Sequence, residues 1–419
     1  MCACSRCVRV CARARASNVQ PARDTHVAAQ SKLCDALRLR HSLAKGARVC
    51  LCCGCCVRHH VALGGAVRAF AVLNGYRGFY DGEWTPLLPD EVSHAHLRGG
   101  TILGSSRGGM DAPRIVDSLV KNGVNIVILI GGDGTHRGAD LLHRTILARN
   151  LPITVACVPK TIDNDIGIID RSFGFQTAVD EAVPAIQCAH TEALSAKNGI
   201  GLVKLMGREA GFIALYASLA SRDVNMCLLP EAPWRMSNLL TWLEGRLERS
   251  AHAVIVVAEG AESLEQREAA SGGTPFTPVS ATPAAGGVAP TPAAGAPVAR
   301  RTDESGNRIL DDVGEHLKNA INAHFKSIGK VATLKYIDPS YIIRSSPANA
   351  ADSELCARLA FNCVHGAMAG FSGFTVGTVD GVSVYLPTSV VANGKPQRVD
   401  ILSRLYARLC SSTGQPSLE

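Results

Sequence analysis

The sequence predicts an α/β protein whose parallel sheets are covered by helices on both faces. Short apolar runs rich in Val and Ile alternate along the chain with longer stretches of helical periodicity, a pattern typical of buried parallel strands joined by helices. The 40 glycines and a hydrophobic content of 47%, with only 5% aromatic residues, suit many tight strand-to-helix turns. At 419 residues the chain is long enough for two or three domains.

The elements follow in order. Apolar runs predict five strands, and helical spacing of apolar residues predicts a helix after each of the first four and another near residue 311. The expected strands are Ile126–Ile130, Ile153–Val158, Gly199–Leu205, Asn225–Leu229 and Ala253–Ala258. The expected helices are His136–Ala148, Phe175–Ala196, Glu209–Ser221, Leu239–Arg249 and Asp311–Phe325.

The first of these strands runs directly into the glycine-rich turn G-G-D-G-T, residues 131–135. In open α/β sheets, ligands bind at the carboxyl ends of the strands. Glycines let backbone N–H groups approach phosphate oxygens, and a following helix adds its positive end. Asp133 is placed to hold the magnesium ion that nucleotide phosphates carry. This turn therefore indicates a phosphate site, although unrelated kinases share the motif.

The next strand ends in a turn with two carboxylates, within V-P-K-T-I-D-N-D, residues 158–165. Asp163 and Asp165 are two positions apart and can be given different environments. One can then act as a general base toward a sugar hydroxyl while the other helps to organise metal-bound phosphates. The alternative from this motif alone is an Asx-rich turn that caps the following segment.

Five motifs in a fixed order resemble those of phosphofructokinases. They are G-G-D-G-T, P-K-T-I-D-N-D, Met206-Gly207-Arg208, A-E-G at 258–260 and Y-I-I-R at 341–344. The similarity is greatest to the ATP-dependent form of plants, algae and trypanosomes, and it runs from about Gly75 to Pro416. It implies two similar lobes, each a mostly parallel sheet between helices, and phosphorylation of fructose 6-phosphate to fructose 1,6-bisphosphate with MgATP. It also implies a homo-oligomer, a tetramer in the family.

The resemblance assigns roles residue by residue. Asp163 is expected to be the general base, and Arg107, in L-G-S-S-R, to stabilise the transferred phosphoryl group. Gly132, Asp133, Gly134 and Thr135 are expected to bind ATP, with Asp133 at the Mg²⁺. The sugar phosphate is expected to contact Thr161, Ile162, Asp163, Met206, Gly207, Arg208, Glu259, Tyr341 and Arg344.

Two positions bear on the phosphoryl donor. In this family an aspartate in place of Gly134 accompanies pyrophosphate use, so glycine leaves space for ATP. Lys160 stands where classical bacterial ATP enzymes have glycine and pyrophosphate enzymes have lysine. The combination resembles the plant and trypanosome ATP-dependent group, so ATP is favoured and pyrophosphate is kept as the alternative.

The formal charge of +7 comes from the beginning of the chain. Residues 1–70 hold 12 Lys/Arg and two Asp, and the other 349 hold 31 Lys/Arg and 34 Asp/Glu, a balance of −3. The enzyme part is thus nearly neutral, which gives no reason to expect nucleic-acid binding. No run reaches about 18 apolar residues, so no membrane span is expected.

Residues 1–60 form an atypical Cys/Arg-rich segment with ten of the 16 cysteines. A zinc site, a transit peptide and a sequence that is not natural coding sequence are the open readings. The family's opening strand and its G-G-x-x-P-G-x-N phosphate loop have no match here. A catalytically impaired or regulatory subunit is therefore the alternative function. The expected location is the cytoplasm, or a plastid if residues 1–60 are a transit peptide.

The phosphofructokinase domain is expected to span residues 61–416, with nucleotide-phosphate motifs at 104–135 and sugar-phosphate motifs at 161–344. Residues 261–308 interrupt it. The part from Ser271 to Ala299 carries no charge and is rich in Pro, Gly, Ala and Thr. Such a stretch cannot bury enough apolar surface to offset the loss of chain entropy on folding. We expect a flexible surface insertion that does not split a domain.

Overall fold

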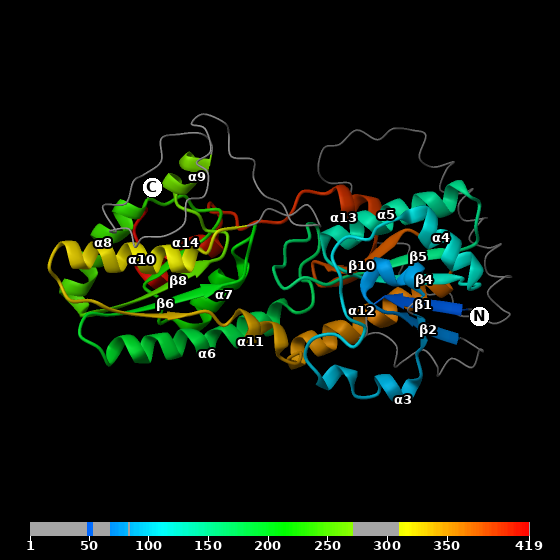
Figure 1. Cartoon of the computed structure of the whole chain (residues 1–419), viewed down its shortest axis with the longest axis horizontal. Helices are drawn as coiled ribbons and strands as arrows, with labels where there is room; N and C mark the ends of the chain where they lie inside the picture. Colours follow the sequence, from blue (N-terminus) through cyan, green and yellow to red (C-terminus); the bar gives the residue numbers. More distant parts are fainter. Residues whose placement is uncertain (1–47, 53–67, 83, 271–309, 419) are drawn as a thin grey trace, which may run out of the picture.

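The computed structural model describes residues 48–52, 68–82, 84–270 and 310–418. These ranges form two lobes that lie side by side along the long axis of the molecule (Figure 1). Most of the N-terminal segment lies outside the described residues, including Cys4-x-x-Cys7 and Cys53-x-x-Cys56, the pairs whose local spacing suggests zinc. Residues 271–309 of the insertion also lie outside them. Within the described ranges, no helix has the length and apolar character needed to cross a bilayer.

The first lobe is built on a seven-stranded sheet with the order β11-β10-β5-β4-β1-β2-β3. Its five inner strands are parallel, and the edge strands β3 and β11 are antiparallel to their neighbours. The strands are β1 Arg48–Cys52, β2 Arg68–Val72, β3 Trp84–Pro86, β4 Ile126–Gly131, β5 Thr154–Pro159, β10 Phe374–Val379 and β11 Val382–Pro387. The helices are η3 Gly75–Arg77, α2 Gly78–Asp81, α3 Pro89–Val92, η4 Ala95–Leu97, α4 Ala112–Lys121, α5 Asp133–Ala148, α12 Ala350–Met368 and α13 Thr388–Asn393.

Alternate residues of the central strand β4 enter two different cores. Ile126, Ile128 and Ile130 pack in the cluster that contains Leu355 and Leu359 of α12. Val127 and Leu129 pack on the other face, in the cluster that contains residues of α4 and α5. This period of two with apolar residues on both faces is what a strand buried between two helical layers requires.

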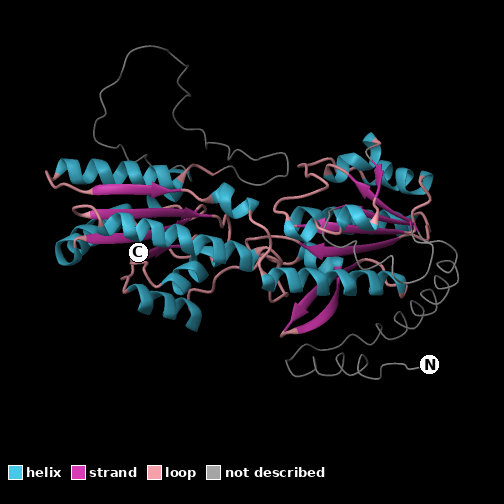
Figure 2. Ribbon diagram, turned by 90° about the horizontal axis from the view of Figure 1, so that it is seen from below, coloured by secondary structure: helices cyan, strands magenta, loops and turns pink. Residues whose placement is uncertain are grey.

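The second lobe has a smaller, fully parallel sheet with the order β7-β8-β6-β9. Its strands are β6 Gly199–Leu205, β7 Met226–Leu228, β8 His252–Ala258 and β9 Thr333–Ile337. Its helices are α6 Phe175–Leu194, α7 Phe212–Ser221, α8 Met236–Ser250, α9 Leu264–Ala270, α10 Val313–Ser327, α11 Ser340–Ser345 and α14 Arg404–Thr413. Helices lie on both sides of the strands in each lobe (Figure 2).

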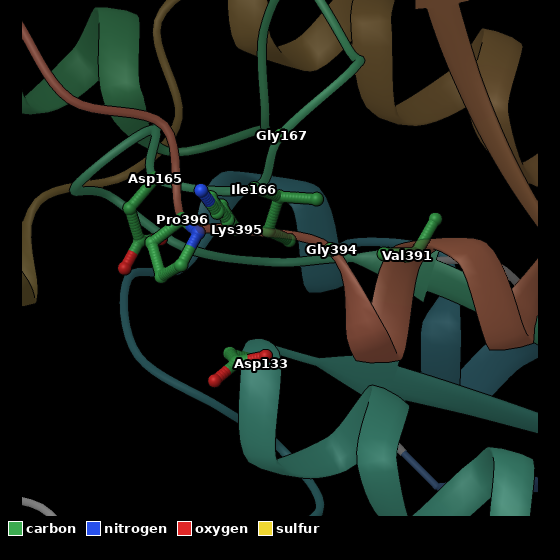
Figure 3. Close-up of a pocket in the computed structure, with 8 residues that line it drawn as sticks. All are labelled: Asp133, Asp165, Ile166, Gly167, Val391, Gly394, Lys395 and Pro396. Carbon is green, nitrogen blue, oxygen red and sulfur yellow. The ribbon is translucent and has the colours of Figure 1, made fainter.

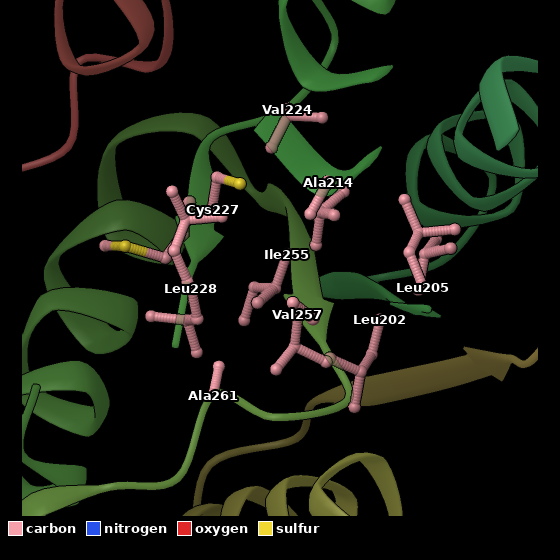
Figure 4. Close-up of a cluster of buried hydrophobic side chains, with 14 of the residues drawn as sticks. Leu202, Leu205, Ala214, Val224, Cys227, Leu228, Ile255, Val257 and Ala261 are labelled. Atoms are coloured by element: carbon pink, nitrogen blue, oxygen red, sulfur yellow. The ribbon is translucent and has the colours of Figure 1, made fainter. Parts of the chain in front are cut away.

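The core of the second lobe is apolar side chains of the sheet and of the helices over it. Leu202, Ile255 and Val257 of the inner strands meet Ala214 of α7 and Leu228 of β7 (Figure 4). All five are at most 3% exposed. The predicted α/β architecture of two lobes with sheets between helices is therefore confirmed.

Two segments that were expected to lack a strand or a helix contain one. The strand β1, within the segment expected to be atypical, is an inner strand of the first sheet and lies between β4 and β2. The expected absence of an opening strand is thus wrong, because R-V-C-L-C is short and rich in cysteine and lacks the usual strand signal. Helix α9 occupies residues 264–270 of the expected insertion, so the part before residue 271 is folded onto the second lobe.

The chain passes between the lobes three times. It leaves the first lobe after β5 and enters the second at α6, returns between α11 and α12, and leaves again between α13 and α14. The first passage contains the carboxylate turn, and the last contains residues 394–403. These connections place motifs from both lobes at the junction.

Candidate active site

The glycine-rich turn begins at the carboxyl end of β4. Gly132 is the N-cap of α5, and the helix starts at Asp133, three residues earlier than predicted. The backbone N–H groups of Thr135 and His136 donate to the Gly132 carbonyl oxygen at 3.0 and 3.1 Å. A Cβ on Gly131 would come within 2.2 Å of the Thr135 hydroxyl oxygen, whereas one on Gly134 would meet no atom within 4 Å. Gly131 is thus needed for packing, and Gly134 faces open space.

A second loop, residues 103–109, contains Arg107 and is linked to this turn through Asn74 and Tyr76. The backbone N–H of Asn74 donates to the Leu103 carbonyl at 2.9 Å, and the Ser106 hydroxyl donates to the Asn74 carbonyl at 2.6 Å. Two residues further on, the Tyr76 hydroxyl donates to the carbonyl of Thr135 at 2.7 Å. The segment from Asn74 to Tyr76 therefore joins the Arg107 loop to the glycine-rich turn. Arg107 itself is exposed.

The carboxylate turn is shaped by Asn164, which has left-handed backbone angles with φ 54°. Its buried side-chain oxygen accepts a hydrogen bond of 2.8 Å from the backbone N–H of Ser172, the kind of local bond that lets asparagine hold this conformation. The Thr161 hydroxyl accepts from the backbone N–H of Asp163 at 3.2 Å. Ile162 packs against the core of the second lobe. The turn is thus fixed with Asp163 and Asp165 on either side of Asn164.

Asp163 is the most strongly perturbed carboxyl group of the turn. Burial raises its pKa to about 7, and the negative charges of Asp165 and Glu259 add to this increase. The positive charges of Arg208 and Arg344 oppose it. One carboxyl group therefore senses residues from three separate motifs, which the sequence placed up to 181 positions apart (344 minus 163). A pKa near neutrality suits a general base.

The residues expected to bind the sugar phosphate lie largely together. Gly207, with φ 134°, accepts at its carbonyl a hydrogen bond of 3.1 Å from the backbone N–H of Gly260. The Arg208 Nε lies 3.7 Å from Glu259 Oε1, and the Arg344 Nε donates to Met206 Sδ at 3.2 Å. The ends of β6, β8 and the helix α11 are joined in this way.

Tyr341 is the expected sugar-site residue that the structure does not bring into this group. It lies one helical turn before Arg344 on α11, and its side chain is 82% exposed. Within the described ranges, its hydroxyl makes no hydrogen bond to the other predicted residues.

A pocket lies between the glycine-rich turn and the carboxylate turn. Its lining includes Asp133, Asp165, Ile166, Gly167 and Lys395 (Figure 3). Burial raises the pKa of Asp165, Thr161 lowers it by a hydrogen bond, and the charge of Asp133 raises it. The buried Oδ1 of Asp165 has no hydrogen-bond partner among the described residues. An orphan carboxylate oxygen beside a second carboxylate fits a hard divalent cation such as Mg²⁺, which prefers oxygen ligands.

Sequence reasoning missed two residues at this site, Tyr76 and Lys395. Tyr76 lies at the start of the range that resembles the family, and no motif there gives it a role. Lys395 stands in N-G-K-P-Q, which has no motif of its own, and only the last passage between the lobes brings it to the pocket. Lys160, expected to bear on donor choice, is exposed, and its backbone N–H donates to Gly131 at 2.9 Å.

Comparison with known proteins places this arrangement in one family. The phosphofructokinase profile matches residues 44–367, a range that begins before β1. A relative from Arabidopsis thaliana, ATP-dependent 6-phosphofructokinase 7, is 47% identical over 357 residues, which are 84% of this chain and 68% of the relative. The chloroplastic ATP-dependent 6-phosphofructokinase 4 of the same plant is 44% identical, over 84% of this chain and 62% of the relative. An ATP-dependent 6-phosphofructokinase of Borreliella burgdorferi is 41% identical, over 84% of this chain and 75% of the relative.

Solved structures agree at the level of the fold. A pyrophosphate-dependent phosphofructokinase from Marinobacter aquaeolei has a TM-score of 0.66 and 19% identity, over 89% of this chain and 91% of that one. The phosphofructokinase of Pichia pastoris in the T-state has a TM-score of 0.61 and 19% identity, over 83% of this chain and 35% of that one. At such identity these structures speak for the fold alone.

Proposed function

Because this chain belongs to the phosphofructokinase family, we propose that it transfers the terminal phosphate of ATP to fructose 6-phosphate, forming fructose 1,6-bisphosphate. The observation that carries the proposal is the surroundings of Asp163. Its pKa of about 7 arises from burial and neighbouring carboxylates, and two arginines from separate motifs face it. A base with a pKa near neutral pH, close to the positive charges of two arginines, suits deprotonation of a hydroxyl on an anionic sugar.

On the acceptor side, Asp163 takes the proton of the sugar hydroxyl that attacks the phosphoryl group. Arg344, together with Tyr341, holds the 6-phosphate of the sugar, and the Met206–Arg208 turn binds the same substrate. Glu259 accepts hydrogen bonds from sugar hydroxyls. Thr161 and Ile162 shape the turn on which the base stands, as their contacts with Asp163 and with the second lobe support.

On the donor side, the turn from Gly132 to Thr135 binds the phosphates of ATP with backbone N–H groups and the positive end of α5. Arg107 supplies positive charge to the phosphoryl group during transfer. Asp133 would hold Mg²⁺, and the buried Oδ1 of Asp165, which lines the same pocket without a partner among the described residues, would be a second oxygen ligand. When bound, the ion neutralises charge on the phosphate oxygens.

Donor choice rests on Gly134 and Lys160. The space beside Gly134 accommodates a nucleotide, and ATP is the donor that we propose. Pyrophosphate remains the alternative. A catalytically impaired or regulatory subunit is the second candidate function, because residues 53–67, which follow β1, contain no G-G-x-x-P-G-x-N motif.

We propose that the enzyme works as a homo-oligomer, a tetramer by family resemblance. For its location we propose the cytoplasm, with a plastid as the alternative. Two relatives from Arabidopsis thaliana are named chloroplastic and others are not, so the names of the relatives do not decide between these sites.

The test is an assay of the purified full-length chain. We expect fructose 1,6-bisphosphate to form from fructose 6-phosphate and MgATP, and to form much more slowly with pyrophosphate. Chelation of Mg²⁺ should abolish turnover, and re-addition should restore it. Binding of fructose 6-phosphate without turnover would support the regulatory alternative. Phosphorylation of NAD in place of the sugar phosphate would overturn the proposal.

A further inference from the structure

The last passage between the lobes forms a strap, defined here as residues 394–399, that is attached to both lobes. The backbone N–H of Gln397 donates to the Asp165 carbonyl at 2.7 Å. In the second lobe, the Arg398 Nη2 lies 2.5 Å from Glu209 Oε2 and the Val399 backbone N–H donates to Glu231 at 2.8 Å. The strap is therefore fixed against the carboxylate turn.

These attachments place Lys395 at the pocket. A Cβ added to Gly167 would come within 2.7 Å of the Lys395 carbonyl oxygen, so the carboxylate turn and the strap are in close contact at this point. Lys395 lies beside Asp165 and Ile166, with Asp133 across the pocket (Figure 3). Within the described ranges, no ion pair or hydrogen bond engages its ammonium group.

Two carboxylates line the pocket, and their negative charges repel a phosphate that enters it. Asp133 and Asp165 both line it, and Asp133 is paired with Arg137, whose Nη1 lies 2.5 Å from Asp133 Oδ2. The negative charge of Asp133 nevertheless helps to raise the pKa of Asp165. An anionic phosphate that enters between these carboxylates needs cations beyond a single divalent ion. A lysine ammonium is a compact charge with three donors and binds phosphate well.

We propose that Lys395 binds the terminal phosphate of the donor nucleotide. It lines the pocket on the side of the carboxylate turn, which carries the base, and faces the glycine-rich turn, which binds the donor, across that pocket. The transferred phosphoryl group must lie between these two turns. This inference rests on the proposed kinase function and adds to it a residue that no sequence motif indicates.

The test compares Lys395→Met with Lys395→Arg in the full chain. For Lys395→Met we expect kcat/KM for MgATP to fall by about tenfold to a hundredfold, the effect of one charge-assisted hydrogen bond. The inhibition constant of MgADP, which lacks the terminal phosphate, and the KM for fructose 6-phosphate should change by less than about threefold. Lys395→Arg keeps the charge and should retain most activity. Lys121→Met is the matched control, because Lys121 is an exposed lysine at the end of α4 in the first lobe.

The outcomes separate this inference from the function on which it rests. A wild-type chain with no turnover of MgATP overturns both. An active wild type with an unaffected Lys395→Met variant overturns the role of Lys395 alone. The role of Lys395 is also overturned if the affinity for MgADP falls by the same factor as kcat/KM for MgATP, because Lys395 would then bind the inner phosphates. A weakened KM for the sugar phosphate would assign Lys395 to the other substrate and also overturn the proposal.

Discussion

The Tyr76 hydroxyl donates a hydrogen bond of 2.7 Å to the carbonyl oxygen of Thr135, 59 residues later in the chain. The tyrosine ring also lies so close to Gly138 that a Cβ there would come within 2.6 Å of the hydroxyl oxygen. Two contacts thus hold the segment that carries the Arg107 loop against the first turns of α5. Tyr76 is thus one direct link between the Arg107 loop and the glycine-rich turn.

Tyr76→Phe should loosen that attachment and leave the fold intact. The loss of one neutral hydrogen bond costs about 1 kcal/mol of unfolding free energy. We expect the KM for ATP to rise by about fivefold, a change of similar energy, and the KM for fructose 6-phosphate to stay the same. Steady-state kinetics measure the two KM values, and denaturant unfolding measures the free energy of unfolding. Tyr385→Phe, which removes a similar bond of 3.0 Å to Asn362, should cost comparable stability without any effect on ATP.

Asp163→Asn should lower kcat by about 10²- to 10⁴-fold, the usual contribution of general base catalysis. The amide is isosteric with the carboxyl group and removes a buried charge, so the variant should fold as well as the wild type. Calorimetry should find both substrates still bound. A variant that keeps more than about a tenth of wild-type turnover would show that another group takes the proton.

The linear sequence predicted more of the fold than of the site. Several long helices and buried strands before residue 326 could be predicted because their apolar periodicity is strong, as in Gly199–Leu205, which the structure reproduces residue for residue. The long helix α12 and the buried strand β10 were not among the predicted elements. The strand β1 could not, because its cysteines and short length hide the pattern, and its partners are distant in sequence.

At the candidate site, the motif residues around Asp163 could be listed from the sequence, but their mutual arrangement could not. The approach of Arg208, Arg344 and Glu259 to one carboxyl group depends on how the second sheet meets the carboxylate turn. Lys395 reaches the pocket only because the chain crosses between the lobes a third time. Such contacts leave no local signal in the residues themselves.

The pH dependence of activity should follow Asp163. The base works in its deprotonated form, and its pKa is raised to about 7, so kcat/KM for fructose 6-phosphate should fall as the pH drops below about 7. The negative charge of Glu259 is one cause of the raised pKa. Glu259→Gln should therefore move the acidic limb of the profile to lower pH, in addition to any loss of substrate binding.

Glu248→Gln is the control for this shift. Glu248 is on α8, where it pairs with Lys330 at 2.8 Å, and its substitution should leave the position of the limb unchanged. An acidic limb that stays in place, or moves to higher pH, in Glu259→Gln would mean that the titrating group is not the carboxyl group that faces Glu259.

Gly134→Asp should abolish the use of ATP without unfolding the protein. A Cβ at this position meets no atom within 4 Å, so the backbone and its neighbours accommodate the new side chain. Its carboxylate would stand against the nucleotide phosphates, and like charges repel. We expect an unchanged melting temperature, an unchanged affinity for fructose 6-phosphate and a KM for ATP too high to measure. Gly134→Ala, which adds bulk without charge, separates the two effects and should retain most activity. If the aspartate variant used ATP as well as the alanine variant, Gly134 would not line the donor site, and donor choice would have to rest on Lys160 or on residues elsewhere.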